Sequence, residues 1–185
     1  SFNNIIDLNA AWSLAVEFEE PACAIIKHTN PCGVAIAATV EEAYKKALSA
    51  DPVSAFGGIV AFNKQVDQKT AESLVEIFLE VIVAPSFSKE ALNVLAGKPN
   101  VRVLEIPNST EKIPLDMKKV SGGFLVQTKD EGEEDEWTWA TEAQADAETL
   151  ADLKFAWKVV KHVKSNAIVC VKNGIAVGVG PGQTN

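Results

Sequence analysis

Extended apolar runs alternate with helical patterns along the first 106 residues of this 185-residue chain. The expected strands are short runs bounded by turn-forming residues, at 22–27, 58–62, 81–84 and 101–106. The expected helices have apolar residues at three- and four-residue spacings or begin at capping residues, and they cover 7–18, 39–49, 68–78 and 88–95. Strands that alternate with helices of roughly ten residues predict an α/β layered fold.

The second half of the chain has a less regular pattern. Glycines open a further expected strand at 122–127, where we expect a β-bulge or a close backbone approach. The acidic run 130–136 lacks calcium-loop spacing, so a solvated loop is expected. A long helix is expected over 143–163. The dipeptide Asn173-Gly174 between two extended runs predicts a closing β-hairpin over 167–179.

The stretch that carries the most chemistry is Lys27-His28-Thr29-Asn30-Pro31-Cys32-Gly33. It follows an expected strand, and its Asn-Pro and Cys-Gly pairs are expected to break regular structure. Ligands bind at the carboxyl ends of strands in open α/β sheets. An imidazole carries protons well near neutral pH. On a regular strand Lys27 and His28 point to opposite faces, so they converge on one ligand only if the backbone turns between them. The alternative is a surface histidine beside a surface lysine.

The composition excludes several classes of protein. An apolar fraction of 47% and a charged fraction of 23% are ordinary for a globular protein. The net charge of -8 argues against a non-specific nucleic-acid binder. Three cysteines without a CxxC pair fit a reducing compartment, and no apolar run reaches the ~18 residues of a membrane span. A cytoplasmic protein is expected. The missing initiator methionine and the final loop indicate a piece of a longer polypeptide.

Three other features have weaker interpretations. Cys32 has no evident base and orienting group, so a small buried residue is favoured over a thiol nucleophile. Zinc is not expected, because the deaminase pattern needs HxE and a later PCxxC, which the residues around His28 and Cys32 do not provide. The segment Ser54-Ala55-Phe56-Gly57-Gly58 is either a backbone-lined ligand loop or a turn. Gly178 to Gly182 resembles a glycine-rich anion loop without its lysine-serine ending.

Several separated segments together resemble a known family. That family is the bifunctional purine-biosynthesis enzyme, which combines aminoimidazole carboxamide ribonucleotide (AICAR) formyltransferase with inosinate (IMP) cyclohydrolase. The chain is similar to the formyltransferase half over essentially its whole length, at 4–12, 27–33, 51–58, 80–85, 122–127, 164–167 and 180–184. The resemblance implies a three-layer, cytidine-deaminase-like α/β module with a mixed sheet, helices on its faces and no zinc site.

The resemblance also implies an activity and a set of site residues. The family transfers a formyl group from the co-substrate 10-formyltetrahydrofolate to the 5-amino group of AICAR, without a metal. His28 matches the family's proton-transfer histidine, and Lys27 matches its partner lysine. Asn166 matches an asparagine that hydrogen-bonds the formyl oxygen. The positions that match those near the bound nucleotide are Asn4, Phe56, Gly57 and Glu80.

The resemblance implies that residues 1–185 are the first of two such modules, without the cyclohydrolase domain and the second module. It implies a homodimer with sites near the subunit interface, nucleotide and folate substrates, and neither nucleic-acid nor membrane partners. We expect the piece to fold but to be inactive alone. Two alternatives stay open: a non-catalytic nucleotide-binding or dimerisation module, and a deaminase-like hydrolase, which bound stoichiometric zinc would favour.

Overall fold

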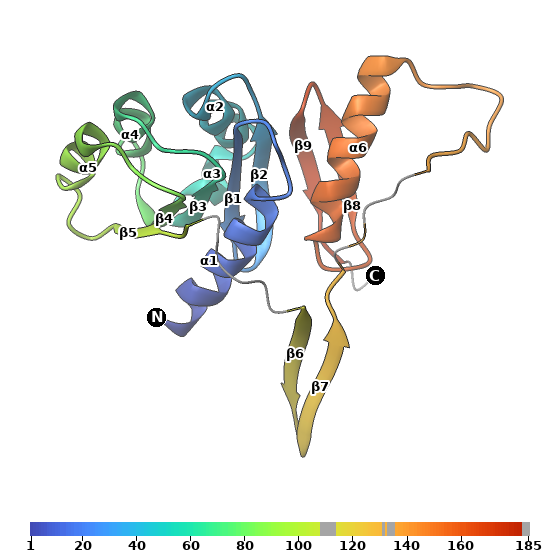
Figure 1. Ribbon diagram of the computed structural model, residues 1–185, viewed down its shortest axis with the longest axis horizontal. Coiled ribbons are helices and arrows are strands. Elements are labelled where there is room, and N and C mark those ends of the chain that lie inside the picture. The colour runs from blue at the N-terminus through green and yellow to red at the C-terminus, as the bar shows by residue number, and fades with distance from the viewer. Residues whose placement is uncertain (108–113, 131, 133–135, 183–185) are drawn as a thin grey trace.

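A seven-stranded mixed sheet forms the centre of the molecule (Figure 1), in the strand order β5-β4-β3-β1-β2-β9-β8. The computed structural model describes residues 1–107, 114–130, 132 and 136–182. Strands β3, β4 and β5 are parallel to one another, and the other neighbouring pairs of this sheet are antiparallel. Its strands are β1 (Ala22–Lys27), β2 (Asn30–Ile36), β3 (Gly58–Phe62), β4 (Leu79–Ala84), β5 (Arg102–Glu105), β8 (Ile168–Lys172) and β9 (Ile175–Gly180).

Helices cover both faces of this sheet. One face packs against α1 (Phe2–Ala15) and α6 (Ala147–Lys161). The other face packs against α2 (Val40–Ala50), α3 (Pro52–Ala55), α4 (Gln68–Leu74) and α5 (Lys89–Leu95). In β1, Cys23 and Ile25 belong to the second core and Ala24 and Ile26 to the first, as the period of two in a strand requires. The predicted α/β fold with a mixed sheet and helices on its faces is therefore confirmed.

Most of the predicted elements are present, with shifted ends. The strands at 22–27 and 58–62 are confirmed to the residue. The side chains of Thr39, Asp67 and Ser88 each accept a hydrogen bond from the amide three residues on, as helix N-caps do. The predicted helix 68–78 ends earlier, at Leu74, and the predicted helix 143–163 is shorter because the side chain of Asp146 caps it at Ala147.

The first helix was placed too late in the chain. It spans Phe2–Ala15 and not 7–18, and its N-cap is Ser1. Phe18 lies beyond the end of the helix, yet its ring is buried and stacks on Phe155 at 5.1 Å between ring centroids. The buried Phe18 extends the helical spacing of apolar residues past the end of the helix, so the spacing alone predicts one turn too many.

The prediction that Asn-Pro and Cys-Gly break regular structure is wrong. Asn30 to Gly33 belong to β2, which pairs with β1 with a register shift between Ile25 and Ile26. Proline lacks an N–H donor and is tolerated at such an irregularity. A Cβ on Gly33 would lie 2.2 Å from the carbonyl oxygen of Ala47 in α2. The glycine thus permits close packing of a helix on the sheet and does not form a turn.

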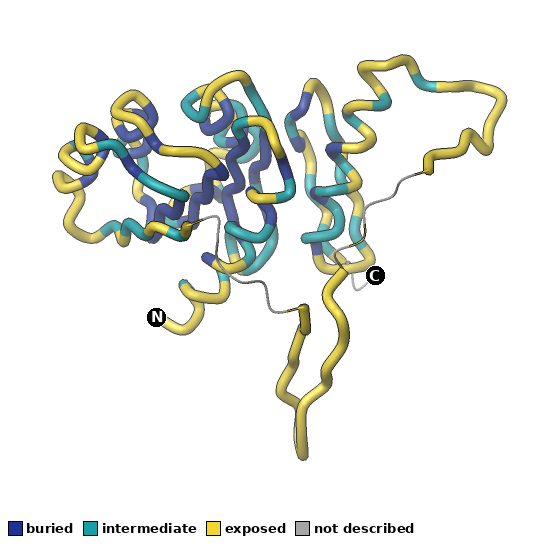
Figure 2. Tube along the Cα trace, viewed as in Figure 1, coloured by how far each residue is buried: buried dark blue, intermediate teal, exposed yellow. Residues whose placement is uncertain are grey.

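Strands β6 (Leu115–Val120) and β7 (Gly123–Thr128) form a separate two-stranded ribbon that projects from the body. Every residue of both strands is exposed (Figure 2). The expected bulge or close approach at 122–127 is wrong: Gly122 occupies the turn with a φ of 88°, and a Cβ on Gly122 or Gly123 would meet no atom within 4 Å. Strand β6 is absent from the predicted elements; Lys119 interrupts the apolar-polar alternation of Leu115 to Lys118.

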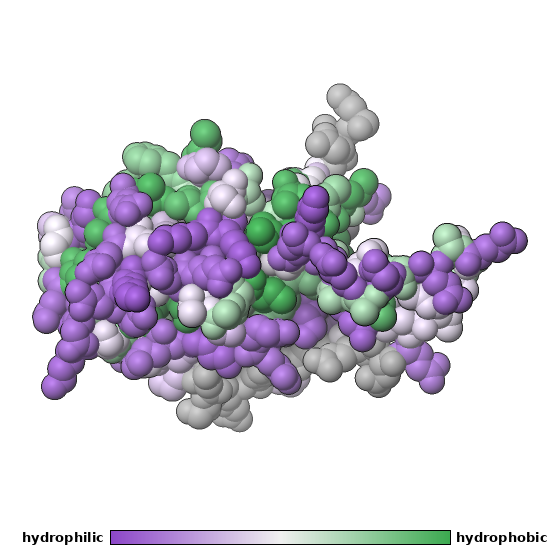
Figure 3. Space-filling view, turned by 90° about the horizontal axis from the view of Figure 1, so that it is seen from above, coloured by the Kyte–Doolittle hydropathy of each residue, from purple (hydrophilic) through white to green (hydrophobic). Residues whose placement is uncertain are grey.

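The remaining expectations concern the surface and the last hairpin. The β8–β9 hairpin around Asn173-Gly174 is confirmed. Residues 131 and 133–135 of the acidic run, and 183–185 at the end of the chain, lie outside the described residues. The face seen in Figure 3 is largely hydrophilic, with separate apolar patches. Within the described ranges, no helix combines the length and apolar character needed to cross a membrane.

Candidate functional site

Most of the predicted site residues lie at one end of the central sheet, where β1 ends and β2, β3 and β4 begin. Because β1 is antiparallel to β2 and β3, the carboxyl end of β1 lies beside the amino ends of β2 and β3. Lys27 ends β1, Phe56 and Gly57 precede β3, and Glu80 is near the start of β4. Lys27 and His28 lie at the carboxyl end of β1, whereas the parallel strands β3, β4 and β5 present their amino ends here.

His28 and Thr29 form a two-residue turn between β1 and β2. Lys27 and Asn30 pair across it, and the two turn residues have positive φ angles of 51° and 65°. Positive φ at both central residues is the pattern of a type I′ turn, which favours Asn-Gly. For a histidine and a β-branched threonine this conformation costs about 1–3 kcal/mol each. The chain therefore keeps an unfavourable backbone conformation at its candidate proton carrier.

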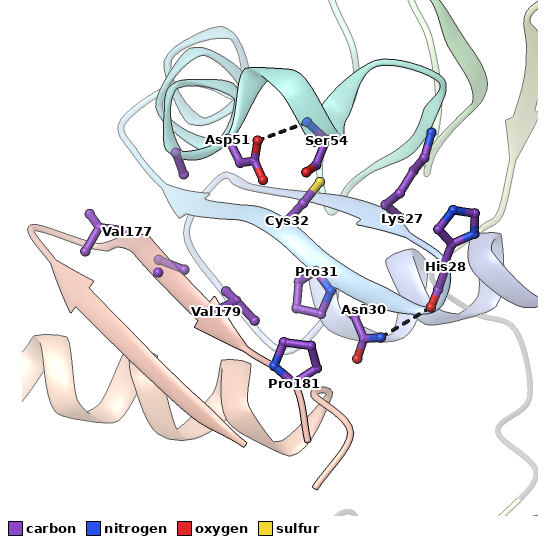
Figure 4. A pocket seen from close by; sticks show the side chains of 13 residues that line it. Lys27, His28, Asn30, Pro31, Cys32, Asp51, Ser54, Val177, Val179 and Pro181 are labelled. Carbon is purple, nitrogen blue, oxygen red and sulfur yellow. Dashed lines mark hydrogen bonds between the residues drawn. The ribbon is translucent and has the colours of Figure 1, made fainter. Parts of the chain in front are cut away.

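The turn satisfies the condition for Lys27 and His28 to act together. The backbone reverses directly after Lys27, so the two side chains are no longer held on opposite faces of a strand. Figure 4 shows both side chains directed from the end of the hairpin toward the side on which α3 lies. The side chain of Lys27 is half-buried, whereas His28 is exposed.

The amine of Lys27 is held by the segment before β3. Its Nζ donates a hydrogen bond of 2.7 Å to the carbonyl oxygen of Phe56. Gly57 follows with a φ of 67°, and a Cβ there would lie 3.2 Å from the same Nζ. The amide of Gly57 donates to the carbonyl of Phe78 at 2.7 Å. The segment Ser54 to Gly58 is the end of α3 followed by a turn at Phe56 and Gly57, so the turn interpretation is confirmed, and this turn binds the ammonium of Lys27.

An open cleft of about 480 Å³ lies beside this pair. Its walls come from the β1–β2 hairpin, the junction of α2 with α3, and β9 with the residue that follows it (Figure 4). The residues that line it are Lys27, His28, Asn30, Pro31, Cys32, Ala50, Asp51, Ser54, Ala176, Val177, Gly178, Val179 and Pro181. The cleft thus combines a cation, an imidazole and a carboxylate with an apolar wall, which suits a polar aromatic ligand.

Cys32 lies in this cleft but is poorly suited to nucleophilic attack. Its thiol donates a hydrogen bond of 3.5 Å to the carbonyl of Ile25. Burial, and then the nearby carboxylate of Asp51, raise the pKa of this thiol to about 11. A thiol reacts as its thiolate, so the raised pKa favours the structural interpretation of Cys32.

Asn4 and Glu80 meet at the same end of the sheet, but they do not line the cleft. The Nδ2 of Asn4 lies 3.5 Å from Oε2 of Glu80. The same carboxylate oxygen accepts a hydrogen bond of 2.7 Å from Arg102, the first residue of β5. Sequence reasoning missed Arg102, although it is the only arginine of the chain and was therefore a visible signal.

Asn166 is exposed in the segment between α6 and β8. Among the hydrogen bonds of the described residues, none joins it to Lys27 or His28, so the structure does not bring it into direct contact with them. It is nonetheless close in sequence to Lys164, whose amide donates to Oδ1 of Asn30 at 3.3 Å. Asn30 and Asp7, both missed from the sequence, contact the hairpin turn itself.

The second histidine, His162, lies outside the cleft and belongs to an ion-pair cluster. Its Nε2 is 2.9 Å from Oε1 of Glu17, and Lys161 Nζ is 2.8 Å from the same oxygen. Burial raises the pKa of Glu17, but hydrogen bonds from His162 and Lys161 outweigh it and bring the pKa down to about 2. This cluster ties α6 to the segment after α1. Over the ranges that the structure describes, no group of three or more His, Cys, Asp or Glu residues is arranged to hold a metal ion.

Comparison with known proteins gives a consistent match. A family model described as "AICARFT/IMPCHase bienzyme" matches residues 1–185. The "Bifunctional purine biosynthesis protein PurH" of Thermoanaerobacter sp. (strain X514) is 56% identical over 187 residues, which are 100% of this chain and 37% of the relative. The protein of the same description from Persephonella marina is 54% identical, over 100% of this chain and 36% of the relative.

The chain therefore spans just over a third of the length of these curated relatives. One solved structure, "Acinetobacter baumannii RibD, form 1", aligns with a TM-score of 0.37 at 15% sequence identity. The alignment covers 54% of this chain and 33% of that one. A similarity of this size does not bear on the fold or the function.

Proposed function

Since this chain belongs to the AICARFT/IMPCHase bienzyme family, we propose that it is one region of a longer, bifunctional purine-biosynthesis enzyme. In this proposal residues 1–185 form the first of two cytidine-deaminase-like modules of the formyltransferase region. The family match over all 185 residues supports it, as does the greater length of the relatives. The mixed sheet between two helical layers is compatible with such a module. A cytoplasmic location belongs to the same proposal.

The proposed reaction is transfer of a formyl group from 10-formyltetrahydrofolate to the 5-amino group of AICAR. The observation that carries the proposal is the strained His28–Thr29 turn, after which His28 and Lys27 both line one cleft. The accepting amine is a poor nucleophile, because its lone pair is delocalised into the ring and the carboxamide. A positioned base is therefore the group that this reaction needs most.

The proposed steps conserve atoms and charge. The amine nitrogen bonds to the formyl carbon and gives its proton to the imidazole of His28. The formyl oxygen takes up negative charge, to which the side-chain amide of Asn166 donates a hydrogen bond. The bond between the formyl carbon and the folate nitrogen then breaks, and His28 returns the proton to that nitrogen. The ammonium of Lys27, held by the Phe56 carbonyl, stabilises the developing negative charge.

The nucleotide is proposed to bind at the same end of the sheet. Phe56 is 61% exposed although its ring packs at a tilt against Phe78, so its ring offers a surface for a heterocycle. Gly57 is half-buried, and its lack of a side chain leaves room for the Nζ of Lys27 beside it. Asn4 and Glu80 supply an amide and a carboxylate beyond it. Hydrogen bonds to the ribose or to the carboxamide suit this pair.

We also propose that the complete protein is a homodimer, and that the β6–β7 ribbon takes part in the interface. A two-stranded ribbon is marginally stable alone in water. The side chains on one of its faces are mostly apolar, and they are Leu115, Met117, Phe124 and Val126. Each of these four is at least 42% exposed within the described chain. The dimeric formyltransferase region of the family favours a second copy as the partner that covers this face.

The experiment that tests the function measures formyl transfer by the complete polypeptide with AICAR and 10-formyltetrahydrofolate. The variant His28→Ala should lower kcat at least ~100-fold, the scale expected for loss of a general base. The matched control is His162→Ala, which removes the other histidine and should keep kcat. The isolated 185-residue chain should be inactive. Unchanged kcat in His28→Ala, or near-normal turnover by the isolated chain, would contradict the proposal.

The same preparation distinguishes the alternatives. The family match supports formyl transfer over a deaminase-like hydrolase and over a non-catalytic module. Stoichiometric zinc in the purified protein, with hydrolytic release of ammonia from a nucleotide, would favour the hydrolase. Weakened assembly with unchanged turnover in His28→Ala would favour the module.

A further inference from the structure

The His28–Thr29 turn is held from two sides by side chains that have no part in the mechanism above. Neither turn residue prefers its observed backbone conformation, as described above, so other contacts have to compensate. The two side chains are Asp7, in the middle of α1, and Asn30, the first residue of β2. Both are half-buried, and both bind backbone groups of the turn.

Asp7 holds the second turn residue. Its Oδ1 accepts a hydrogen bond of 2.8 Å from the amide of Thr29. The same sheet contains a matching arrangement at the β8–β9 turn, where Asp152 of α6 accepts 2.8 Å hydrogen bonds from the amides of Asn173 and Gly174. Asn-Gly favours this turn by itself. Asp152 thus supports a favourable turn, whereas Asp7 supports an unfavourable one.

Asn30 connects the turn to the segment that carries Asn166. Its Nδ2 donates to the carbonyl oxygen of His28 at 3.3 Å, and its Oδ1 accepts from the amide of Lys164 at 3.3 Å. A primary amide supplies both a donor and an acceptor, which a carboxylate does not. The carbonyl of Lys164 in turn accepts from the amide of Gly182 at 2.8 Å. One side chain therefore links parts of the chain 134 residues apart.

We propose that Asp7 and Asn30 are positioning residues, which hold the imidazole of His28 in register with Lys27 and with the segment Lys164–Asn166. The inference rests on the proposed function, because Asp7 and Asn30 matter to the reaction only if His28 transfers its proton. Neither residue touches the reacting atoms in this account. A displacement of about 1 Å at a reacting group lowers rates by up to ~100-fold, so loss of either contact affects the chemical step.

The test uses the complete polypeptide and separates kcat from KM in formyl transfer. Asp7→Ala and Asn30→Asp should each lower kcat ~10-fold, because the base is displaced. Asp7 does not line the cleft, so Asp7→Ala should also leave KM within ~2-fold. Asp7→Asn keeps an acceptor oxygen and should restore kcat to within ~2-fold of the wild type. The matched control is Asp152→Ala, which should lower thermal stability and leave kcat unchanged.

A further variant covers the case in which Asp7→Ala fails to fold. Thr29→Gly relieves the strain of a β-branched residue at positive φ, and it also loosens the turn. It should raise the melting temperature and lower kcat, a combination that a folding defect does not produce. Unchanged kcat in Asn30→Asp and Thr29→Gly, or a loss in Asp7→Asn equal to that in Asp7→Ala, would overturn the inference. If His28→Ala itself keeps kcat, the proposed function fails and not merely the positioning.

Discussion

The Nζ of Lys27 lies 2.7 Å from the carbonyl oxygen of Phe56, although the two residues are 29 positions apart. This contact joins the hairpin that carries His28 to the turn that precedes β3. It orients a flexible side chain with a backbone group, so the ammonium is placed by the fold itself.

Gly57→Ala should weaken both the fold and the site. The residue has a φ of 67°, and an added Cβ would lie 3.2 Å from the Nζ of Lys27. An alanine in the left-handed region costs about 1–2 kcal/mol, so urea unfolding should report a loss of that size. In the complete polypeptide kcat should fall as well, because the ammonium is displaced. The control Gly123→Ala adds a Cβ that meets no atom within 4 Å and should change stability by less than ~0.5 kcal/mol. Equal effects of the two substitutions would contradict this account.

Gly33→Ala should destabilise the chain strongly. A Cβ at this position would lie 2.2 Å from the carbonyl oxygen of Ala47, so α2 has to move away from the sheet. Overpacking of this kind costs about 3 kcal/mol. At Gly178, in β9 of the same sheet, the nearest atom to an added Cβ is at 3.7 Å, an ordinary contact. Urea unfolding of both variants checks the prediction, which fails if Gly33→Ala is as stable as Gly178→Ala.

Glu17 should make stability depend on pH in the acid range. Its pKa is about 2 in the folded protein against an ordinary value of 4.5, despite burial, because His162 and Lys161 bind the carboxylate. A lowered pKa adds stability that is complete above pH ~4.5 and is lost as the pH falls toward ~2. The contribution is at most about 3 kcal/mol, and solvent at the partly exposed carboxylate reduces it.

Thermal unfolding between pH 2 and 7 measures this contribution of Glu17. The variant Glu17→Gln should be less stable than the wild type at pH 7, and the two curves should converge near pH 2. The control Glu19→Gln removes an exposed carboxylate two positions away and should leave the pH profile unchanged. A constant difference between Glu17→Gln and the wild type across this range would show that the carboxylate is not the titrating group.

The β6–β7 ribbon should contribute to assembly through one face only. Phe124 pairs with Lys119 on the face that also carries Met117 and Val126, whereas Leu125 points to the other face. Phe124→Lys should raise the dimer dissociation constant of the complete polypeptide at least ~10-fold, since it places a charge in an apolar contact. Sedimentation analysis of Phe124→Lys and of its neighbour Leu125→Lys makes the comparison. A dimer that both variants leave intact would exclude the ribbon from the interface.

Elements with strong local signals could be predicted from the sequence. The runs at β1 and β3 are apolar and clearly bounded, and the side chains of Thr39, Asp67 and Ser88 mark helix starts by a direct physical contact. The Asn173-Gly174 pair supplies the residues that a tight hairpin prefers. In each case the local chemistry and the final structure agree.

The β1–β2 hairpin could not be predicted in the same way. Its turn consists of His28 and Thr29, which have no preference for positive φ, while Asn30-Pro31 and Cys32-Gly33 resemble turn sequences but lie in a strand. Asp7 accepts a hydrogen bond from the turn, and Lys164 contacts the adjacent Asn30, but no local pattern reveals these long-range contacts.

Some residues of the candidate site are also marked by their local sequence, and others are not. Lys27 and His28 follow from their place at a strand end, and the structure brings Lys27 together with Phe56 and Gly57. Asn4, Glu80 and Asn166 had support only from the resemblance to the family, because nothing in their local sequence marks them as functional. Arg102 needed the pairing of β4 with β5 to appear beside Glu80.

The most direct test is a structure of the complete polypeptide with AICAR bound. The account predicts that the exocyclic amine of the nucleotide lies within ~3.2 Å of a ring nitrogen of His28, the reach of a general base. It also predicts the Lys27 ammonium still bound to the Phe56 carbonyl. A nucleotide whose amine faces away from this imidazole, or one bound in a cavity that neither side chain borders, would contradict the account.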